Sequence, residues 1–294
     1  MKQTFYKLLS YLGWMIVVSA IIIPAIYGFS YYDLSIMERP YSELHHQLKP
    51  GGFTGHWFGV AGSMLMIIGV VTYSTRKRTY LLYNKGSVSA WLKFHIFCCS
   101  LGPVLVIWHT AFKLNGLVSI SFWSMIMVVL SGVIGRFFYT QIPRTRTGIE
   151  LDFETAKKMI EEMTTEIFSK FQFSENLKLQ LESYIQFPAA LSDSSSMKTI
   201  KSVFSDDLKR VFSRRDLITQ LKKETNLPTE ELRSLASLLE SRSLLARKLA
   251  TVKLFSSLLH YWHVFHLPFA LIMLIIMLVH VGVALWMGYG YNLL

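Results

Sequence analysis

Residues 91–112, WLKFHIFCCSLGPVLVIWHTAF, form an apolar stretch with a histidine near either end, His95 and His109. A second apolar stretch, HLPFALIMLIIMLVHV at residues 266–281, has the same arrangement in His266 and His280. Both pairs are 14 residues apart (109 − 95 and 280 − 266), which is close to four helical turns and about 21 Å of helix. Each pair is therefore predicted to lie on one face of a helix, at two depths.

The composition is that of a membrane protein. Of the 294 residues, 52% are hydrophobic and 14% aromatic, which is too apolar for an ordinary soluble chain. We predict an all-α integral membrane protein with five spans, at about 12–31, 56–73, 91–112, 120–139 and 258–289. The first span is expected to be retained, because residues 16–31 lack the small-residue cleavage site of a signal peptide.

The distribution of the basic residues indicates a membrane topology rather than a nucleic-acid-binding surface. The net charge is +11, but the basic residues flank spans on one predicted side, as the positive-inside rule requires. We therefore expect lipid contact and no nucleic-acid partner, with the N-terminus inside and the C-terminus outside. The basic residues on that side are Lys2, Lys7, Arg76, Lys77, Arg78, Lys85, Lys93, Arg136 and Arg144.

The chain is predicted to have three parts. Residues 1–144 hold spans one to four, residues 145–253 form a cytoplasmic helical insert, and residues 254–294 hold span five. The insert is polar with apolar residues at helical spacing, and a helix start is predicted at Pro228 and Thr229. It has no glycine-rich phosphate loop, no cysteine cluster and no histidine, so docking or structural support is the expected role. The adjacent Cys98 and Cys99 are expected to pack between helices.

The histidine pairs indicate two haems. Spans three and five both run outward, so His95 is predicted to face His266 near the cytoplasm and His109 to face His280 near the outer surface. A low-spin b-type haem takes two neutral imidazoles, one on each side of the iron. A single zinc ion is disfavoured, since about 21 Å separates the members of a pair. The expected cofactors are thus two bis-histidine b-type haems in a four-helix core.

Further residues have open roles. His56 opens the second span near the outer pair and is a candidate quinol-site base, propionate partner, substitute ligand or packing residue. His263 lies one turn before His266 and is its rival as the cytoplasmic ligand. Arg136, with Lys93 and Arg144, is a candidate partner for haem propionates, although any interfacial basic side chain can also extend toward water. His45 and His46 are expected to be solvated.

Four stretches carry a resemblance. These stretches resemble di-haem b-type membrane cytochromes of bacterial respiratory chains. They are GHWFGVAGSMLMIIG at 55–69, the stretch at 91–112 quoted above together with Lys113, SFWSMIMVVLSGVIGRFFYTQIPR at 121–144, and HYWHVFHLPFALIMLIIMLVHVGVAL at 260–285. The histidine plan is also similar to that of ferric-reductase-like membrane domains, but this chain lacks their flavin and nicotinamide domain. The insert has no counterpart in the resemblance.

The resemblance implies haem b ligation and quinone-linked electron transfer in a bacterial inner membrane. The expected function is a di-haem cytochrome b subunit of a quinol oxidoreductase, carrying electrons between quinone or quinol and a multihaem cytochrome c or other redox partner. One alternative is a transmembrane reductase module fed by a separate cytoplasmic flavoprotein. Another is a non-redox membrane anchor or sensor.

Overall fold

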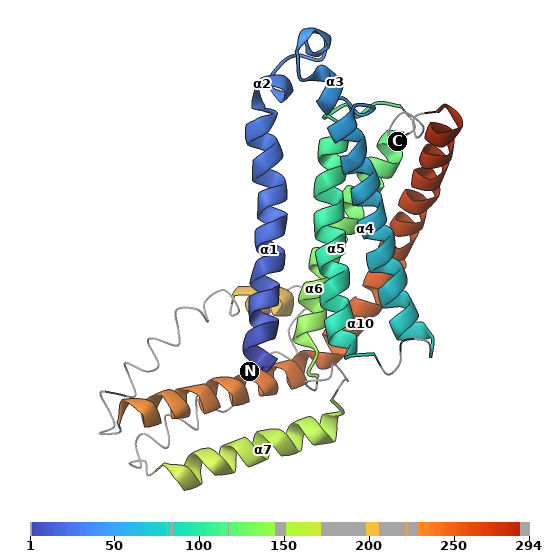
Figure 1. The fold of residues 1–294 in the computed structure, drawn as a ribbon. Coiled ribbons are helices and arrows are strands. Elements are labelled where there is room, and N and C mark those ends of the chain that lie inside the picture. The colour runs from blue at the N-terminus through green and yellow to red at the C-terminus, as the bar shows by residue number, and fades with distance from the viewer. Residues whose placement is uncertain are drawn as a thin grey trace. The chain divides into compact units, whose positions relative to one another are not determined.

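The computed structural model describes residues 2–80, 82, 85–116, 118–144, 151–171, 198–205, 222 and 228–288, and this part of the chain is helical. The prediction of an all-α fold is confirmed for these residues. The elements (Figure 1) are α1 (Lys2–Tyr27), α2 (Phe29–Tyr32), the 3-10 helix η1 (Arg39–Tyr41), α3 (His45–Leu48), α4 (Phe53–Arg78), α5 (Val88–His109), α6 (Val118–Gln141), α7 (Phe153–Lys170) and α10 (Thr229–Trp286).

Within the described part of the chain, five helical segments are long and apolar enough to cross a membrane: Ser10–Tyr27, His45–Arg78, Val88–His109, Val118–Gln141 and Glu230–Trp286. The prediction of five spans is confirmed, and the chain is a multi-pass membrane protein. Large apolar side chains on these helices are exposed, for example 74% of Ile26. Such side chains suit contact with lipid, in which an exposed apolar surface has no cost.

The fifth apolar segment belongs to a longer helix than the sequence suggested. The predicted span begins near residue 258, whereas α10 begins at Thr229 and continues without interruption. No glycine or proline occurs between Thr229 and Leu267, and the stretch is rich in Leu, Ala, Arg and Lys, which favour helix. The predicted helix start at Pro228 and Thr229 is confirmed.

Contacts divide the chain into two units. One contains residues 1–134 and 262–294, and the other contains residues 135–261. The predicted domain boundaries at 144/145 and 253/254 stay a prediction. Residues 172–197 of the predicted insert and the last six residues lie outside the described part of the chain.

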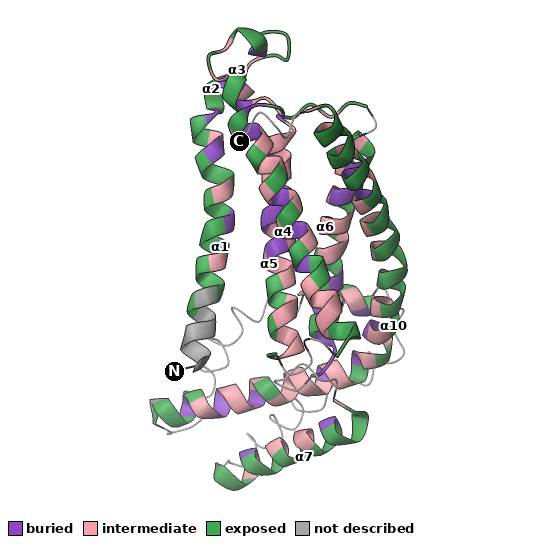
Figure 2. Cartoon of the chain, turned by 45° about the vertical axis from the view of Figure 1, so that its right-hand side comes forward, coloured by how far each residue is buried: buried purple, intermediate pink, exposed green. Residues whose placement is uncertain are grey.

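Helices α4 and α5 of the first unit approach through glycines. A Cβ atom added to Gly62 would lie 2.7 Å from the Gly102 carbonyl oxygen, and one added to Gly102 would lie 2.8 Å from the Gly62 oxygen. Both distances are far below van der Waals contact, so the two backbones touch directly, as small residues permit in membrane helices. Figure 2 shows α4 beside α5, and Gly62 and Gly102 are both buried.

A methionine cluster packs in the middle of the first unit. Met66 of α4, Met125 of α6, and Met273 and Met277 of α10 are buried together. Met273 lies seven residues from both His266 and His280 (273 − 266 and 280 − 273). The cluster therefore lies between the two histidine levels of α10, where flexible thioethers fill irregular space.

The second unit has an apolar core and a capped helix. Ile142, Val203 and Phe255 are buried together. Asp152 caps the N-terminus of α7, and its carboxylate accepts a hydrogen bond of 3.0 Å from the backbone N–H of Thr155. Hydrogen bonds from Thr155 lower the pKa of this carboxyl group, because they stabilise its charged form.

Candidate functional site

Backbone carbonyls of α4 orient both histidines of α5. The His109 ring donates from Nδ1 to the Gly55 oxygen at 2.8 Å, and the His95 ring donates from Nδ1 to the Gly69 oxygen at 3.1 Å. Gly55 and Gly69 are themselves 14 residues apart (69 − 55). Because α4 and α5 run antiparallel and in contact, equal spacing places one carbonyl beside each histidine.

The His109 ring lies in the space that Gly59 leaves open. A Cβ atom at Gly59 would lie 2.7 Å from His109 Nδ1, 2.8 Å from Cγ and 2.9 Å from Cε1. No side chain larger than hydrogen fits beside the ring in this position. Gly59 therefore leaves the space that the His109 ring occupies, and the Gly55 oxygen fixes the orientation of the ring.

The His95 ring has three neighbours. Its Nδ1 bonds to the Gly69 oxygen, the Tyr73 ring stacks on it at a centroid distance of 5.3 Å and an angle of 29°, and Cys99 Sγ lies 3.6 Å from Nδ1. Cys98 is buried against Gly69, where an added Cβ atom would lie 2.7 Å from Cys98 Cβ. The cysteines thus pack between helices, as expected.

Ser131 of α6 fixes the ring of His266. Its hydroxyl donates to the Val128 oxygen at 2.9 Å and lies 2.7 Å from His266 Nδ1. A hydroxyl has one hydrogen, so the second bond must run from His266 Nδ1–H to Ser131 Oγ. Trp262 donates to the Ser131 carbonyl oxygen at 2.7 Å, and its ring lies 4.6 Å from that of His266.

Three of the four rings therefore share one tautomer. Nδ1 carries the hydrogen in His95 and His109, because the carbonyl oxygen beside each ring can only accept, and in His266 as long as the Ser131 hydroxyl donates its own hydrogen to the Val128 oxygen. The lone pair is then on Nε2, for which the described residues provide no hydrogen-bond partner. A histidine that ligates a metal commonly donates its other N–H to a carbonyl or similar acceptor, which fixes the ring. His280 is half-buried, and the described residues provide no hydrogen-bond partner for its ring.

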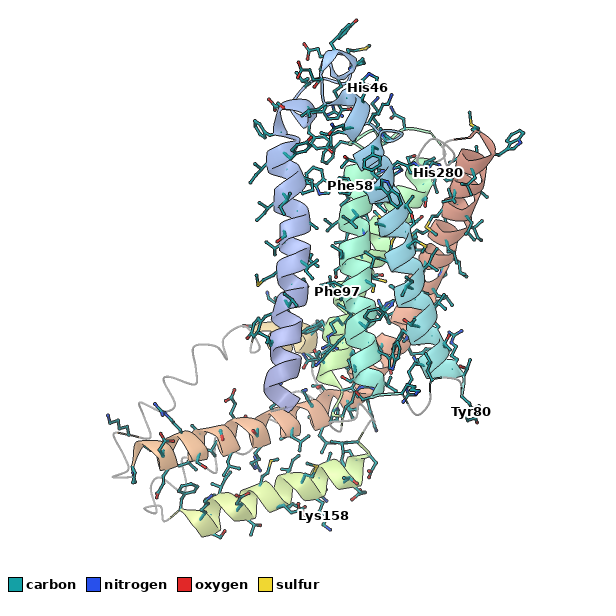
Figure 3. The ribbon with its side chains drawn as sticks, viewed as in Figure 1. His46, Phe58, Tyr80, Phe97, Lys158 and His280 are labelled. Atoms are coloured by element: carbon teal, nitrogen blue, oxygen red, sulfur yellow. The ribbon has the colours of Figure 1, made fainter. Side chains whose placement is uncertain are left out.

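The structure brings the predicted partners together. The ring centres of His109 and His280 lie 6.3 Å apart at an interplanar angle of 59°, so the rings face each other without stacking. His266 lies within electrostatic range of His95. Figure 3 shows His280 on α10 and Phe58 on α4 toward the end of the first unit that carries α3 and His46.

The His109–His280 pair fits a bis-imidazole haem. Two metal–nitrogen bonds of about 2 Å, with each nitrogen roughly 1 Å from its ring centre, place the centres about 6 Å apart. The observed 6.3 Å agrees with this value. Within the described residues, no three His, Cys, Asp or Glu side chains are grouped to hold a metal ion; a bis-histidine haem needs only two.

The other predicted residues have varied surroundings. His56 is half-buried and within electrostatic range of His109, so its alternatives stay open. His263 is exposed and its ring packs edge-on against that of Trp262 at 4.6 Å. Arg136 belongs to the second unit, where its guanidinium lies 5.5 Å from the Tyr139 ring; its propionate role stays a prediction.

The neighbouring histidines His45 and His46 differ in their exposure to solvent. His46 is exposed as expected, but His45 is half-buried, and its Nδ1 lies 3.2 Å from the Tyr31 hydroxyl. The expectation that both side chains are solvated stays a prediction. A tyrosine 14 residues earlier in the chain was the missed partner.

Sequence reasoning also missed the residues that hold the rings. Gly55, Gly59, Gly69 and Ser131 contribute carbonyls, space or a hydroxyl and none of them is a ligand type. The glycine spacing was a usable signal, whereas nothing in the sequence connects Ser131 to His266, 135 residues away. Comparison of the chain with protein-family models, with curated proteins and with solved structures gave no match.

Proposed function

We propose that the protein is a di-haem cytochrome b that carries electrons through the membrane. One b-type haem is assigned to His95 and His266, and the other to His109 and His280. The observation that carries the proposal is the shared tautomer: three rings are held by Nδ1 with the Nε2 lone pair available. The 6.3 Å separation of the His109 and His280 ring centres supports it.

The chain supplies orientation and environment for these groups. Gly55, Gly69 and Ser131 hold the imidazoles by their Nδ1 atoms, so little ring motion is lost when Nε2 binds iron. The buried methionine cluster keeps the space between the two levels apolar, which raises the cost of an unpaired charge there. Haem, when bound, supplies one-electron chemistry.

The proposed redox partners come from the resemblance stated above. Quinone or quinol is the proposed partner at one end of the first unit, and a multihaem cytochrome c or other redox subunit is the partner at the other. The basic residues in the last turn of α4, Arg76, Lys77 and Arg78, support an orientation in which the C-terminal end of α4 is cytoplasmic. The proposed location is a bacterial inner membrane with the insert in the cytoplasm.

Electron exchange with quinone is the direct test of this function. The purified protein is reduced with dithionite in detergent, excess reductant is removed, and a soluble quinone analogue is added. The proposal expects the b-type absorption to bleach within the mixing time of a stopped-flow instrument. Haem that stays reduced with the quinone, but is oxidised by ferric chelates, would contradict the quinone link and indicate a reductase module.

The choice of His266 over His263 is tested in the same preparations. His266 is half-buried and held by Ser131, whereas His263 is exposed. His266→Ala is expected to lose one haem, while the matched His263→Ala retains both. The opposite pattern would show that His263 is the ligand.

A further inference from the structure

A buried arginine lies at the outer end of the proposed haem site. Arg39 of η1 is 5% exposed. Its guanidinium donates to three backbone oxygens: Nη1 to Ala111 at 2.5 Å, Nη2 to Tyr32 at 2.9 Å, and Nε to Leu34 at 3.1 Å. The side chain is therefore held in one place by neutral acceptors.

No negative group among the described residues neutralises the charge of Arg39. Within the described residues no carboxylate lies within ion-pair distance of Arg39, and both Asp33 and Glu38 are exposed. The Tyr31 ring lies 5.4 Å from the guanidinium carbon. Burial raises the pKa of Tyr32 to about 12, so this phenol is neutral at physiological pH. Arg39 thus keeps a full positive charge in a poorly solvated position.

The charge of Arg39 is closer to the His109–His280 pair than to the His95–His266 pair. Ala111 lies two residues after His109, and its backbone has a φ of 45°, as part of the turn that ends α5. Ala111 follows His109 by two residues of at most about 3.8 Å each, so the guanidinium that donates to the Ala111 oxygen lies within roughly 10 to 15 Å of His109. His95 lies about 21 Å further along α5.

We propose that Arg39 raises the reduction potential of the centre held by His109 and His280 above that of the centre held by His95 and His266. The inference rests on the proposed function. Gain of an electron lowers the charge of a centre by one, which a nearby buried cation favours. At 10 to 15 Å and an effective dielectric constant of about 20, the effect is about tenfold in the reduction equilibrium, or about 59 mV for a one-electron couple.

The difference in reduction potential determines which of the two centres an electron occupies. An electron shared between the two centres is found mainly at the His109–His280 centre, at the end where Arg39 lies. The side-chain hydrogen bonds of Arg39 go to backbone oxygens and not to His109 or His280, so Arg39 acts through its charge and is not a catalytic residue.

Redox titration of the full-length protein, followed by haem absorption, tests the proposal. His280→Ala and His95→Ala assign the two midpoints. Arg39→Gln is expected to lower the His109–His280 midpoint by about 59 mV and the other midpoint, for a centre roughly 21 Å further away, by only about a third of that. Arg39→Lys keeps the charge and is expected to stay near the wild-type value. Lys113→Gln is the matched control, because Lys113 is an exposed cation at the same end that water screens.

Three outcomes would overturn the inference. Arg39→Gln leaves both midpoints unchanged, or it shifts the two equally, or Lys113→Gln has the same effect. If Arg39→Gln does not accumulate, the wild-type protein decides: a His109–His280 midpoint that is the more negative of the two overturns the inference. Absence of haem overturns the proposed function as well, whereas two haems with unshifted midpoints overturn this inference alone.

Discussion

Replacing Gly59 by alanine adds a single methyl group beside the proposed outer haem site, that of His109 and His280; the proposed inner site is that of His95 and His266. The added Cβ atom would lie 2.7 to 2.9 Å from three atoms of the His109 ring, whereas ordinary contact needs about 3.5 Å or more. The ring must therefore move by several tenths of an ångström. That movement strains the 2.8 Å hydrogen bond from His109 Nδ1 to the Gly55 oxygen, which sets the direction of Nε2.

The expected cost is that of overpacking a tight site, about 1 to 3 kcal/mol. Since about 1.4 kcal/mol is tenfold in affinity, Gly59→Ala should weaken the outer haem by roughly 5- to 150-fold. The inner haem should be unaffected, because His95 lies four helical turns away. Purified variants are compared by haem content per chain after dilution and by reduced-minus-oxidised spectra.

Gly282→Ala is the matched control. Gly282 also lies within a membrane helix, and a Cβ atom there would meet nothing within 4 Å; the substitution is expected to stabilise α10 by about 0.5 to 1 kcal/mol. Gly282→Ala should therefore keep both haems. Full haem content and an unchanged spectrum in Gly59→Ala would refute the placement of the His109 ring.

The remaining predictions concern the inner site and the second unit. Ser131→Ala removes the acceptor that fixes His266 and should weaken the inner haem by about 10- to 100-fold, measured by haem loss on dialysis; Ser131→Thr should restore binding, and equal loss in both variants would argue against the hydroxyl. His95→Ala should remove one haem and leave the spectrum of the other, and full haem retention would exclude His95 as a ligand. Because its folded-state pKa is lowered, the Asp152 cap should stabilise α7 above about pH 4 and lose this effect as the pH falls through the lowered pKa. Amide exchange of α7 should therefore accelerate in acid more in the wild type than in Asp152→Asn, and identical acid profiles would contradict the cap.

The sequence predicted the parts that depend on periodic patterns. Apolar length alone gives the five spans, and the 14-residue spacing of His95 and His109 predicts a common face because helix geometry is fixed. The pairing of His109 with His280 followed from charge topology, and the structure brings these rings within 6.3 Å.

The sequence did not predict what depends on packing between distant segments. The contact of Ser131 with His266 joins two helices through a hydroxyl whose partner no local pattern specifies. The direct approach of Gly102 to the α4 backbone is of the same kind, because a glycine indicates close approach without specifying which segment lies opposite it. The buried position of Arg39 depends on the turn at Ala111, which places a carbonyl where a charged side chain can reach it.

The haem content of the purified chain tests the central claim most directly. Haem b is extracted and quantified against polypeptide concentration, in the same sample that gives a reduced-minus-oxidised spectrum. The account predicts two b-type haems per chain with a low-spin spectrum. A ratio near one would remove one of the histidine pairs, and absence of a b-type band would contradict the account as a whole.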